Sequence, residues 1–378
     1  MNIVIEQNDW SLLQNAIDQV SSAGGGKVTV ACNISDSHTI FLKDNVELHL
    51  AHGSGITGSE KWEDYTDFRP PELGGLAPEK SNCTLLAAVN ARNIAVTGPG
   101  TLACPGQKFY DTTQTSYGGR FYAKPQTPRP RILHLVDCSE VHLSETLYLN
   151  SPCWTIWLCG CDHVTIRGIR IDGDQMMINN DGIDIDSCRD VTVSDCNIKT
   201  ADDCLVLRAM PRGRETPDIC ENVVVTNCIL NSACQGIRVG CPSDDTIRNC
   251  RFSNLIMNCP GNGIHIDNPK HYLRRGCNGN LALSDIFFSH ITLKTGWYPL
   301  RINVEEGIRL RALRNIVFDD LQMESATPCC FTGSSETLLD GITLRNSTWI
   351  RPASTEEMLI VRHCRRLNLD NFELREQD

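Results

Sequence analysis

A short alternating segment recurs along most of this 378-residue chain. The segment has four residues. Its second residue is Val, Ile or Leu, its fourth is Val, Ile, Leu or Phe, and the other two vary. Its first clear copy is Asn93–Val96. Eight further copies begin at residues 140, 163, 190, 222, 285, 315, 341 and 366. Neighbouring copies stand 23 residues (140 to 163) to 32 residues (190 to 222) apart, except at two longer gaps where loops insert.

Self-similarity at this period is typical of a solenoid, in which each repeat packs on its neighbours. Each copy is followed by Asn, Asp, Ser or Gly, and no helical pattern lies between copies. Alternating apolar residues bounded by turn residues indicate short strands. The Leu-x-x-Leu-x-Leu signature of leucine-rich repeats is missing, and a propeller uses a longer period. The sequence therefore predicts an all-β, right-handed parallel β-helix forming one domain over residues 1–378.

Only the N-terminus has a helical pattern. Ser11 and Gln14 form a capping-box pattern, and Leu13, Ile17 and Val20 follow helical spacing. Three glycines at 24–26 end the run. Because an open solenoid exposes the unpaired edge of its terminal coil, we expect a capping helix within residues 8–26.

Two long segments are polar, rich in Gly or Pro, and aromatic, namely residues 61–78 and 109–130. They are expected to be loops on the side of a binding groove, because loops on a rigid scaffold often carry function. An irregular surface without function is the alternative.

The chain has twenty cysteines, and five of them share one phase of the repeat. Each of the five stands two residues before an alternating segment: Cys138, Cys161, Cys188, Cys220 and Cys364. A small apolar residue at a fixed phase indicates a stack inside a solenoid, whereas zinc-like spacings are missing. We therefore expect free, buried thiols, which fit a cytoplasmic location. The alternative is a secreted protein whose signal peptide has been removed.

Charge and hydropathy restrict the partners. The net charge of −11 argues against a nucleic-acid partner and gives no attraction to anionic membranes. No apolar run approaches the roughly 20 residues of a membrane span, and Met1–Glu6 does not begin a secretion signal.

Two aspartate motifs stand about twenty residues apart, Asn179-Asn180-Asp181-Gly182 and Ala201-Asp202-Asp203-Cys204. Clustered carboxylates suit the cleavage of a glycosidic bond, because one carboxyl protonates the leaving oxygen while an ionised one activates water. The simpler explanation of such residues is that they form turns.

The motifs and several other segments resemble the polygalacturonase-like enzymes of glycoside hydrolase family 28. The aspartate motifs match the family's Asn-Thr-Asp and Asp-Asp. The remaining matches are Leu42–Leu50, Gly98–Leu102, Arg129–Arg131 and Ser151–Ile156.

This resemblance implies a pectin-lyase-like parallel β-helix and an inverting hydrolysis without metal or cofactor. In this scheme Asp202 is the general acid, and Asp181 and Asp203 orient and deprotonate the water. Asn179 is implied to contact the carbohydrate substrate, and so is Tyr298, which falls where the family places a substrate-contacting tyrosine.

Two family motifs are altered. Gly-His-Gly falls on Cys234-Gln235-Gly236, and Arg-Ile-Lys falls on His265-Ile266-Asp267. In the family, that Arg and Lys contact galacturonate. Residues two apart on a strand point the same way, so His265 and Asp267 should face the groove together. Asp267 would repel a uronate there unless it is itself paired, and the altered residues suit sugar hydroxyls better.

Other basic residues could restore the positive charge. Arg238 follows Gln235 on an expected groove-facing strand, where lining the groove and lying at the surface are equally good interpretations. Lys270, Arg274 and Arg275 stand in an expected loop and are interpreted as surface charges.

These features favour an inverting hydrolase acting on a plant or microbial glycan other than plain polygalacturonate, such as a pectic fragment containing rhamnose or galactose. Loss of the family's His, Arg and Lys also fits a non-catalytic carbohydrate-binding β-helix. A polysaccharide lyase is a further alternative, in which the aspartates could bind calcium. The sequence leaves endo or exo action and the oligomeric state open.

Overall fold

The structure is a computed structural model that describes residues 1–273, 277–352 and 359–376. Strands make up 53% of it, and they pair in parallel except in one hairpin. The chain forms two compact units. The N-terminal unit contains residues 1–184 and 190–202, and the C-terminal unit contains residues 185–189 and 203–378. The strands β18 (Ile183–Asp186) and β19 (Arg189–Ser194) contain residues of both.

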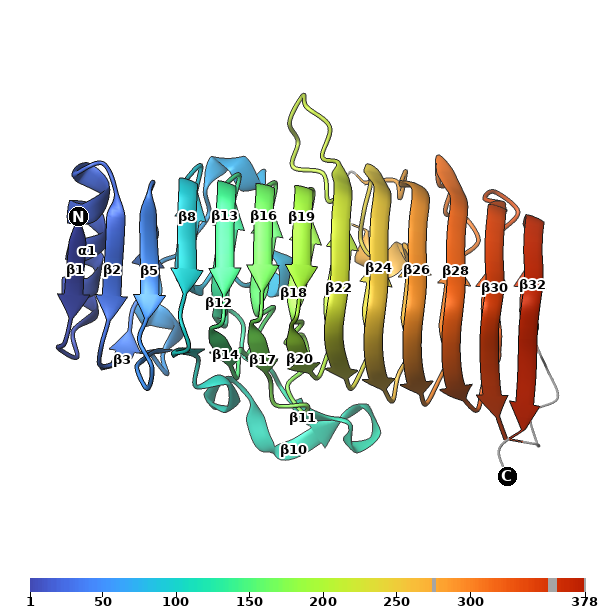
Figure 1. Cartoon of the computed structure of the whole chain (residues 1–378), viewed down its shortest axis with the longest axis horizontal. Coiled ribbons are helices and arrows are strands. Elements are labelled where there is room, and N and C mark those ends of the chain that lie inside the picture. Colours follow the sequence, from blue (N-terminus) through green and yellow to red (C-terminus); the bar gives the residue numbers. More distant parts are fainter. Residues whose placement is uncertain (274–276, 353–358, 377–378) are drawn as a thin grey trace. The chain divides into compact units, whose positions relative to one another are not determined.

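The N-terminal unit has three parallel ladders, so each coil contributes up to three short strands (Figure 1). The first ladder contains β1 (Asn2–Ile5), β2 (Gly26–Val30), β5 (Val46–Leu50), β8 (Arg92–Thr97), β13 (Ser139–Ser144) and β16 (Asp162–Arg167). The second contains β3 (Asn33–Ser37), β6 (Gly55–Gly58), β9 (Thr101–Ala103), β14 (Leu147–Leu149), β17 (Arg170–Asp172) and β20 (Asn197–Thr200). The third contains β4 (Ile40–Phe41), β7 (Thr84–Val89), β12 (Arg131–Val136) and β15 (Ile156–Cys159).

The C-terminal unit has two parallel ladders, one of long strands and one of short strands (Figure 1). The long strands are β22 (Cys220–Ser232), β24 (Thr246–Cys259), β26 (Ala282–Thr295), β28 (Ala312–Ser325), β30 (Leu339–Arg351) and β32 (Cys364–Glu376). The short strands are β21 (Leu205–Arg208), β23 (Ile237–Val239), β25 (Ile264–Asp267), β27 (Leu300–Asn303), β29 (Cys329–Thr332) and β31 (Leu359–Arg362).

Residues at the same phase of successive coils stack in columns inside each unit. Phe252, Phe288 and Phe318 lie on neighbouring long strands, are fully buried, and stack with ring centroids 4.9 and 5.1 Å apart. Such aromatic pairs stabilise the coil-to-coil contact beyond the area that they bury. The parallel β-helix predicted from the repeat is confirmed, whereas a single domain over residues 1–378 stays a prediction.

The first residue of each repeat has a left-handed backbone. Asn93 has φ 54°, Asn222 has φ 57° and Asn249 has φ 53°. Asn adopts this conformation more readily than most residues. Its side chain also hydrogen-bonds the equivalent residue of the preceding coil, as Asn249 Nδ2 does to Asn222 Oδ1 at 2.6 Å. These positions therefore bend the chain and fix the register of one coil on the next.

The expected N-terminal helix is α1 (Trp10–Ser22), and Leu13, Ile17 and Val20 are fully buried as predicted. The predicted capping box of Ser11 and Gln14 is wrong. Asp9 is the N-cap, and its carboxylate accepts the backbone N–H of Ser11 at 2.8 Å. The helix begins one residue before Ser11, so Ser11 lies inside it. The role of α1 as a cap of the solenoid stays a prediction.

The two expected loops contain some regular structure. Residues 61–80 include the 3₁₀ turns Trp62–Asp64, Pro71–Leu73 and Pro78–Lys80. Residues 106–123 include the turns Gly106–Phe109 and Tyr117–Gly119 and an antiparallel hairpin of β10 (Asp111–Ser116) and β11 (Phe121–Ala123). The short turn Lys270–Tyr272 lies in the C-terminal unit. The groove-side role of these loops stays a prediction.

All twenty cysteines are free thiols in this structure, and sixteen of them are buried. Four members of the predicted ladder are buried, but Cys364 is half-exposed because it begins β32, the last strand of its ladder. Burial raises the pKa of the thiols of Cys83 to about 11 and of Cys250 to about 12. A protonated, buried thiol reacts slowly, whatever the compartment.

We therefore expect thiol titration of the native protein to modify at most the four half-exposed cysteines quickly: Cys32, Cys234, Cys277 and Cys364. All twenty should react after denaturation. Several disulfides in non-reducing mass spectrometry would contradict this prediction and favour an oxidising compartment.

Candidate active site

The predicted site residues form two groups, one in each unit, joined by the peptide bond between Asp202 and Asp203. In the N-terminal unit, the backbone N–H of Asn179 donates to Oδ2 of Asp202 at 3.2 Å. Oδ1 of Asn180 accepts the N–H groups of Ala201 and Asp202, at 2.7 and 3.2 Å. One amide oxygen thus fixes the turn that carries Asp202. Asn180 stands where the family has a polar Thr, and no role was predicted for it from the sequence.

A buried arginine supports the first motif. Arg129 is 1% exposed, and its Nη2 donates to Oδ1 of Asn179 at 2.8 Å. Its Nε donates to the carbonyl oxygen of Pro152 at 2.7 Å, and its guanidinium lies 5.8 Å from the ring centre of Tyr110. The Tyr110 hydroxyl lies 2.6 Å from the carbonyl oxygen of Ile178. The side-chain oxygen of Asn179 is therefore engaged by Arg129, and its predicted contact with substrate stays a prediction.

The three predicted catalytic carboxylates differ in exposure. Asp181 is 2% exposed and Asp203 is 1% exposed, whereas Asp202 is half-buried. Asp202 is thus the carboxylate of the three that solvent reaches most easily. This difference suits a residue that transfers a proton to an incoming molecule.

In the C-terminal unit, three polar residues lie side by side on neighbouring short strands. The parallel register pairs Arg238 of β23 with His265 of β25, and His265 with Arg301 of β27. Paired residues of parallel strands project from the same face of the sheet. The altered family motif and its neighbours therefore share one face.

Arg238 and Asp267 form a bidentate ion pair. Nε of Arg238 lies 3.0 Å from Oδ1 of Asp267, and Nη2 lies 2.8 Å from Oδ2. Nη1 of Arg238 also lies 3.7 Å from Oδ2 of Asp203. Of the two interpretations of Arg238, the surface charge is wrong, because its side chain is 13% exposed.

This ion pair neutralises Asp267. Burial raises the pKa of Asp267 most strongly, but the charge and hydrogen bonds of Arg238, together with His265 and Arg301, outweigh burial and hold this pKa below its usual value. The repulsion of a uronate by Asp267, expected from the sequence, is thus compensated by Arg238. The same pairing occupies Arg238, which therefore no longer offers the substrate an unengaged cation.

His265 is 6% exposed, and neither ring nitrogen has a hydrogen-bond partner. Its Nε2 lies 3.7 Å from Oδ2 of Asp267. Burial lowers the pKa of His265 to about 4; the nearby Asp267 opposes this shift, and the cations of Arg238 and Arg301 add to it. The imidazole is therefore neutral at pH 7.

We expect this histidine to make the protein acid-labile. The unfolded chain binds a proton near pH 6.5 but the folded chain only near pH 4, so stability falls as the pH drops between these values. The loss attributable to His265 is about 3 kcal/mol. Urea unfolding of the wild type and of His265→Gln at pH 7 and pH 4 measures it. Equal losses in both proteins would contradict the prediction.

Two other predicted substrate contacts have partners within the protein. Oε1 of Gln235 accepts Nδ2 of Asn262 at 3.0 Å, so Gln235 is partly engaged. The guanidinium carbon of Arg301 lies 5.2 Å from the ring centre of Tyr298. Arg301 was not predicted as a site residue. It is the polar middle residue of the apolar–polar–apolar run Leu300–Ile302.

The remaining basic candidates are surface residues or lie outside the structure's described part. Lys270 is exposed, as expected for a surface charge. Arg274 and Arg275 fall outside the described residues.

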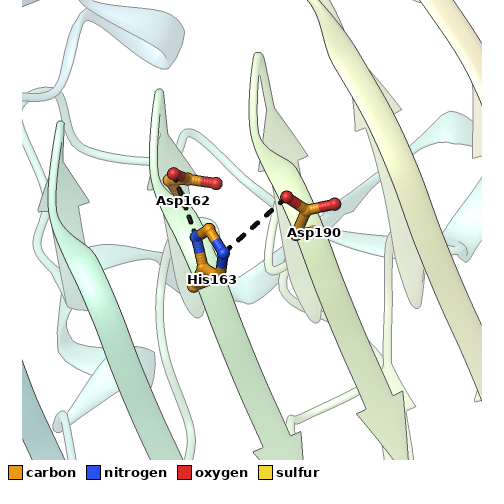
Figure 2. A group of neighbouring side chains, drawn as sticks. All are labelled: Asp162, His163 and Asp190. Atoms are coloured by element: carbon orange, nitrogen blue, oxygen red, sulfur yellow. Dashed lines mark ion pairs between the residues drawn. The ribbon is translucent and has the colours of Figure 1, made fainter.

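One exposed group has the donor types of a metal site. Figure 2 shows the imidazole of His163 between the carboxylates of Asp162 and Asp190, with N···O distances of 3.0 and 4.0 Å. One ligand atom from each residue lies within 4.8 Å of the others. The hydrogen bond that His163 donates to Asp162 raises the pKa of His163. The contacts of these exposed side chains are those of a surface ion-pair cluster.

Comparison with known proteins finds relatives that are named as polygalacturonases. A probable polygalacturonase of Vitis vinifera is 22% identical over 295 residues, which cover 75% of this chain and 57% of the grape protein. The chain thus spans little more than half the length of that relative. Within the described residues, no helix has the length and apolar character needed to cross a bilayer. The relatives give no support to the expected cytoplasmic location, and buried thiols need no reducing compartment.

Solved structures share the fold. An exopolygalacturonase from Thermotoga maritima superimposes with a TM-score of 0.83 at 18% identity, covering 99% of this chain and 92% of that one. A polygalacturonase from Erwinia carotovora gives a TM-score of 0.73 at 18% identity, with 97% and 95% covered. These neighbours are right-handed parallel β-helices, which confirms the predicted fold class.

Residues 76–304 match the family described as glycosyl hydrolases family 28. This segment is more than half of the chain and contains both aspartate motifs and both altered motifs. The chain belongs to glycosyl hydrolase family 28.

Proposed function

We propose that this protein is an inverting glycoside hydrolase that prefers a pectic fragment containing neutral sugars, such as rhamnose or galactose, to plain polygalacturonate. The observation that carries the preference is the ion pair of Arg238 with Asp267. It leaves a neutral, hydrogen-bonding surface where the family has an Arg and a Lys. Such a surface suits a sugar that presents hydroxyl groups.

The retained aspartates support hydrolysis. Asp202 protonates the leaving oxygen in this proposal, and its orientation is supported by the N–H of Asn179 and by the turn that Asn180 fixes. Asp181 and Asp203 orient and deprotonate the attacking water. General acid catalysis of this kind needs the proton donor within hydrogen-bond reach of the leaving oxygen.

The experiment that tests this function is product analysis on a panel of pectic and non-pectic oligosaccharides. New reducing ends without ultraviolet absorbance of an unsaturated uronate support a hydrolase, and the inverted anomer observed by NMR supports the stereochemistry. Unsaturated products would instead indicate a lyase. Binding without any product would indicate a carbohydrate-binding β-helix.

We expect plain polygalacturonate to be a poor substrate. A uronate opposite Asp267 finds Arg238 already paired with that carboxylate, and a lost charged hydrogen bond costs about 1.5–3 kcal/mol, or roughly tenfold to a hundredfold in kcat/KM. Reducing-sugar assays on galacturonate oligomers and on mixed rhamnose–galacturonate oligomers of equal length measure the ratio. Turnover of polygalacturonate equal to that of a true polygalacturonase would contradict the preference.

A further inference from the structure

Among the described residues, Arg301 forms no ion pair, and the carboxylate that its charge does influence, Asp267, is already paired with Arg238. In the described part of the chain, no carboxylate lies within ion-pair distance of its guanidinium, and its Nε is buried without a hydrogen-bond partner. The side chain is half-buried on β27. A partly buried guanidinium without an ion pair and with an unsatisfied N–H is costly and needs an explanation.

The neighbouring imidazole is unsatisfied as well. His265 lies beside Arg301 in the strand register and is more than nine-tenths buried, yet neither of its ring nitrogens is hydrogen-bonded. A neutral imidazole has one N–H donor and one acceptor. Arg301 and His265 thus offer at least two unused donors on adjacent strands.

The surroundings distinguish Arg301 from Arg238. Arg238 is shared by Asp267 and Asp203, at 2.8 and 3.7 Å, whereas the guanidinium carbon of Arg301 lies 5.2 Å from the ring centre of Tyr298. An aromatic ring under a guanidinium restrains its plane and leaves its N–H groups available. Arg301 is therefore positioned as an anion receptor rather than as a structural ion pair.

We propose that Arg301 and His265 form a subsite for a carboxylate of the substrate, one strand beyond the ion pair of Arg238 with Asp267. A planar guanidinium binds a carboxylate through two parallel hydrogen bonds, and the imidazole N–H adds a third donor. This inference rests on the proposed function and refines its substrate class. The substrate is an acidic oligosaccharide that places a uronate at Arg301 and a neutral sugar at Asp267.

The test measures binding, so that it does not depend on turnover. Calorimetry on the Asp202→Asn protein compares a rhamnose–galacturonate oligosaccharide with the same oligosaccharide after reduction of its carboxylates to alcohols. We expect the acidic form to bind at least about tenfold more tightly. Arg301→Ala should remove this difference by weakening the acidic form alone, and Arg301→Lys should retain part of it.

Arg309→Ala is the matched control, because Arg309 is an exposed arginine of the same unit. It should leave both affinities unchanged, and thermal unfolding checks that each variant is folded. Equal weakening of the acidic and the reduced forms by Arg301→Ala, or no weakening of either, overturns the subsite. If Arg301→Ala does not fold, the same comparison in Arg301→Lys decides: an undiminished preference for the acidic form overturns the proposal.

The proposed hydrolase and the proposed carboxylate subsite can be rejected independently of each other. Discrimination by Arg301 with no hydrolysis in the Asp202-containing protein would reject the proposed hydrolase and retain the carboxylate subsite. Hydrolysis that is indifferent to reduction of the carboxylates would retain the hydrolase and reject the subsite.

Discussion

Asp202→Asn should lower the rate of hydrolysis at least about a hundredfold, while folding and glycan binding persist. Asn has nearly the same shape as Asp but cannot donate the proton that the leaving oxygen needs. The backbone N–H of Asn179 and the hydrogen bond from the backbone N–H of residue 202 to the Asn180 side chain should keep the turn in place. Turnover on an unactivated oligosaccharide, thermal unfolding and calorimetric binding measure the three properties.

Two comparisons sharpen this result. Asp162→Asn changes a half-exposed aspartate of the same unit, outside the predicted site, and should leave turnover unchanged. A substrate with an acidic phenol as leaving group needs little protonation, so Asp202→Asn should lose much less activity on it. Activity of Asp202→Asn within about tenfold of the wild type on the unactivated substrate would remove Asp202 from the acid role.

Arg238→Met should be among the most destabilising single substitutions in the C-terminal unit. It leaves Asp267, which is 8% exposed, as a buried carboxylate without its bidentate partner. Breaking one side of a buried ion pair costs about 3–5 kcal/mol, because the remaining charge is uncompensated. Urea unfolding measures the change in the free energy of unfolding.

The double variant Arg238→Met, Asp267→Leu should recover most of that loss, because no charge then remains buried. The matched control is Arg248→Met, which breaks a surface pair with Glu221 and should cost at most about 1 kcal/mol. Equal losses in Arg238→Met and Arg248→Met would mean that the Arg238 pair contributes no more than a surface contact.

Much of the fold follows from local signals in the sequence. The repeat predicted β8, β13, β16, β19, β22, β26, β28, β30 and β32. The strand β24 was missed because Cys250 takes the place of Val or Ile directly after Asn249. Yet Asn249 has the same left-handed backbone as the other repeat-opening residues, so the polar residue marks the coil more reliably than the apolar one.

The two aspartate motifs were recognisable in the sequence because the residues of each are close in the chain, and their catalytic role stays a prediction. The pairing of Arg238 with Asp267 was not, since 29 residues separate them and their contact depends on the register of neighbouring coils. Arg301 was missed because Leu300–Ile302 reads as an ordinary alternating strand. The signal that could have revealed Arg301 is its position in the repeat, which is the same as that of Arg238 and His265.

The reciprocal pair of Arg238 and Asp267 also restricts how specificity can evolve. Restoring the family's lysine by Asp267→Lys alone would set two cations against each other in a buried place. Replacing Arg238 first would leave the buried carboxylate of Asp267 without its ion-pair partner. Each of these single steps toward the family's motif passes through an unfavourable intermediate, so the two positions are expected to be epistatic.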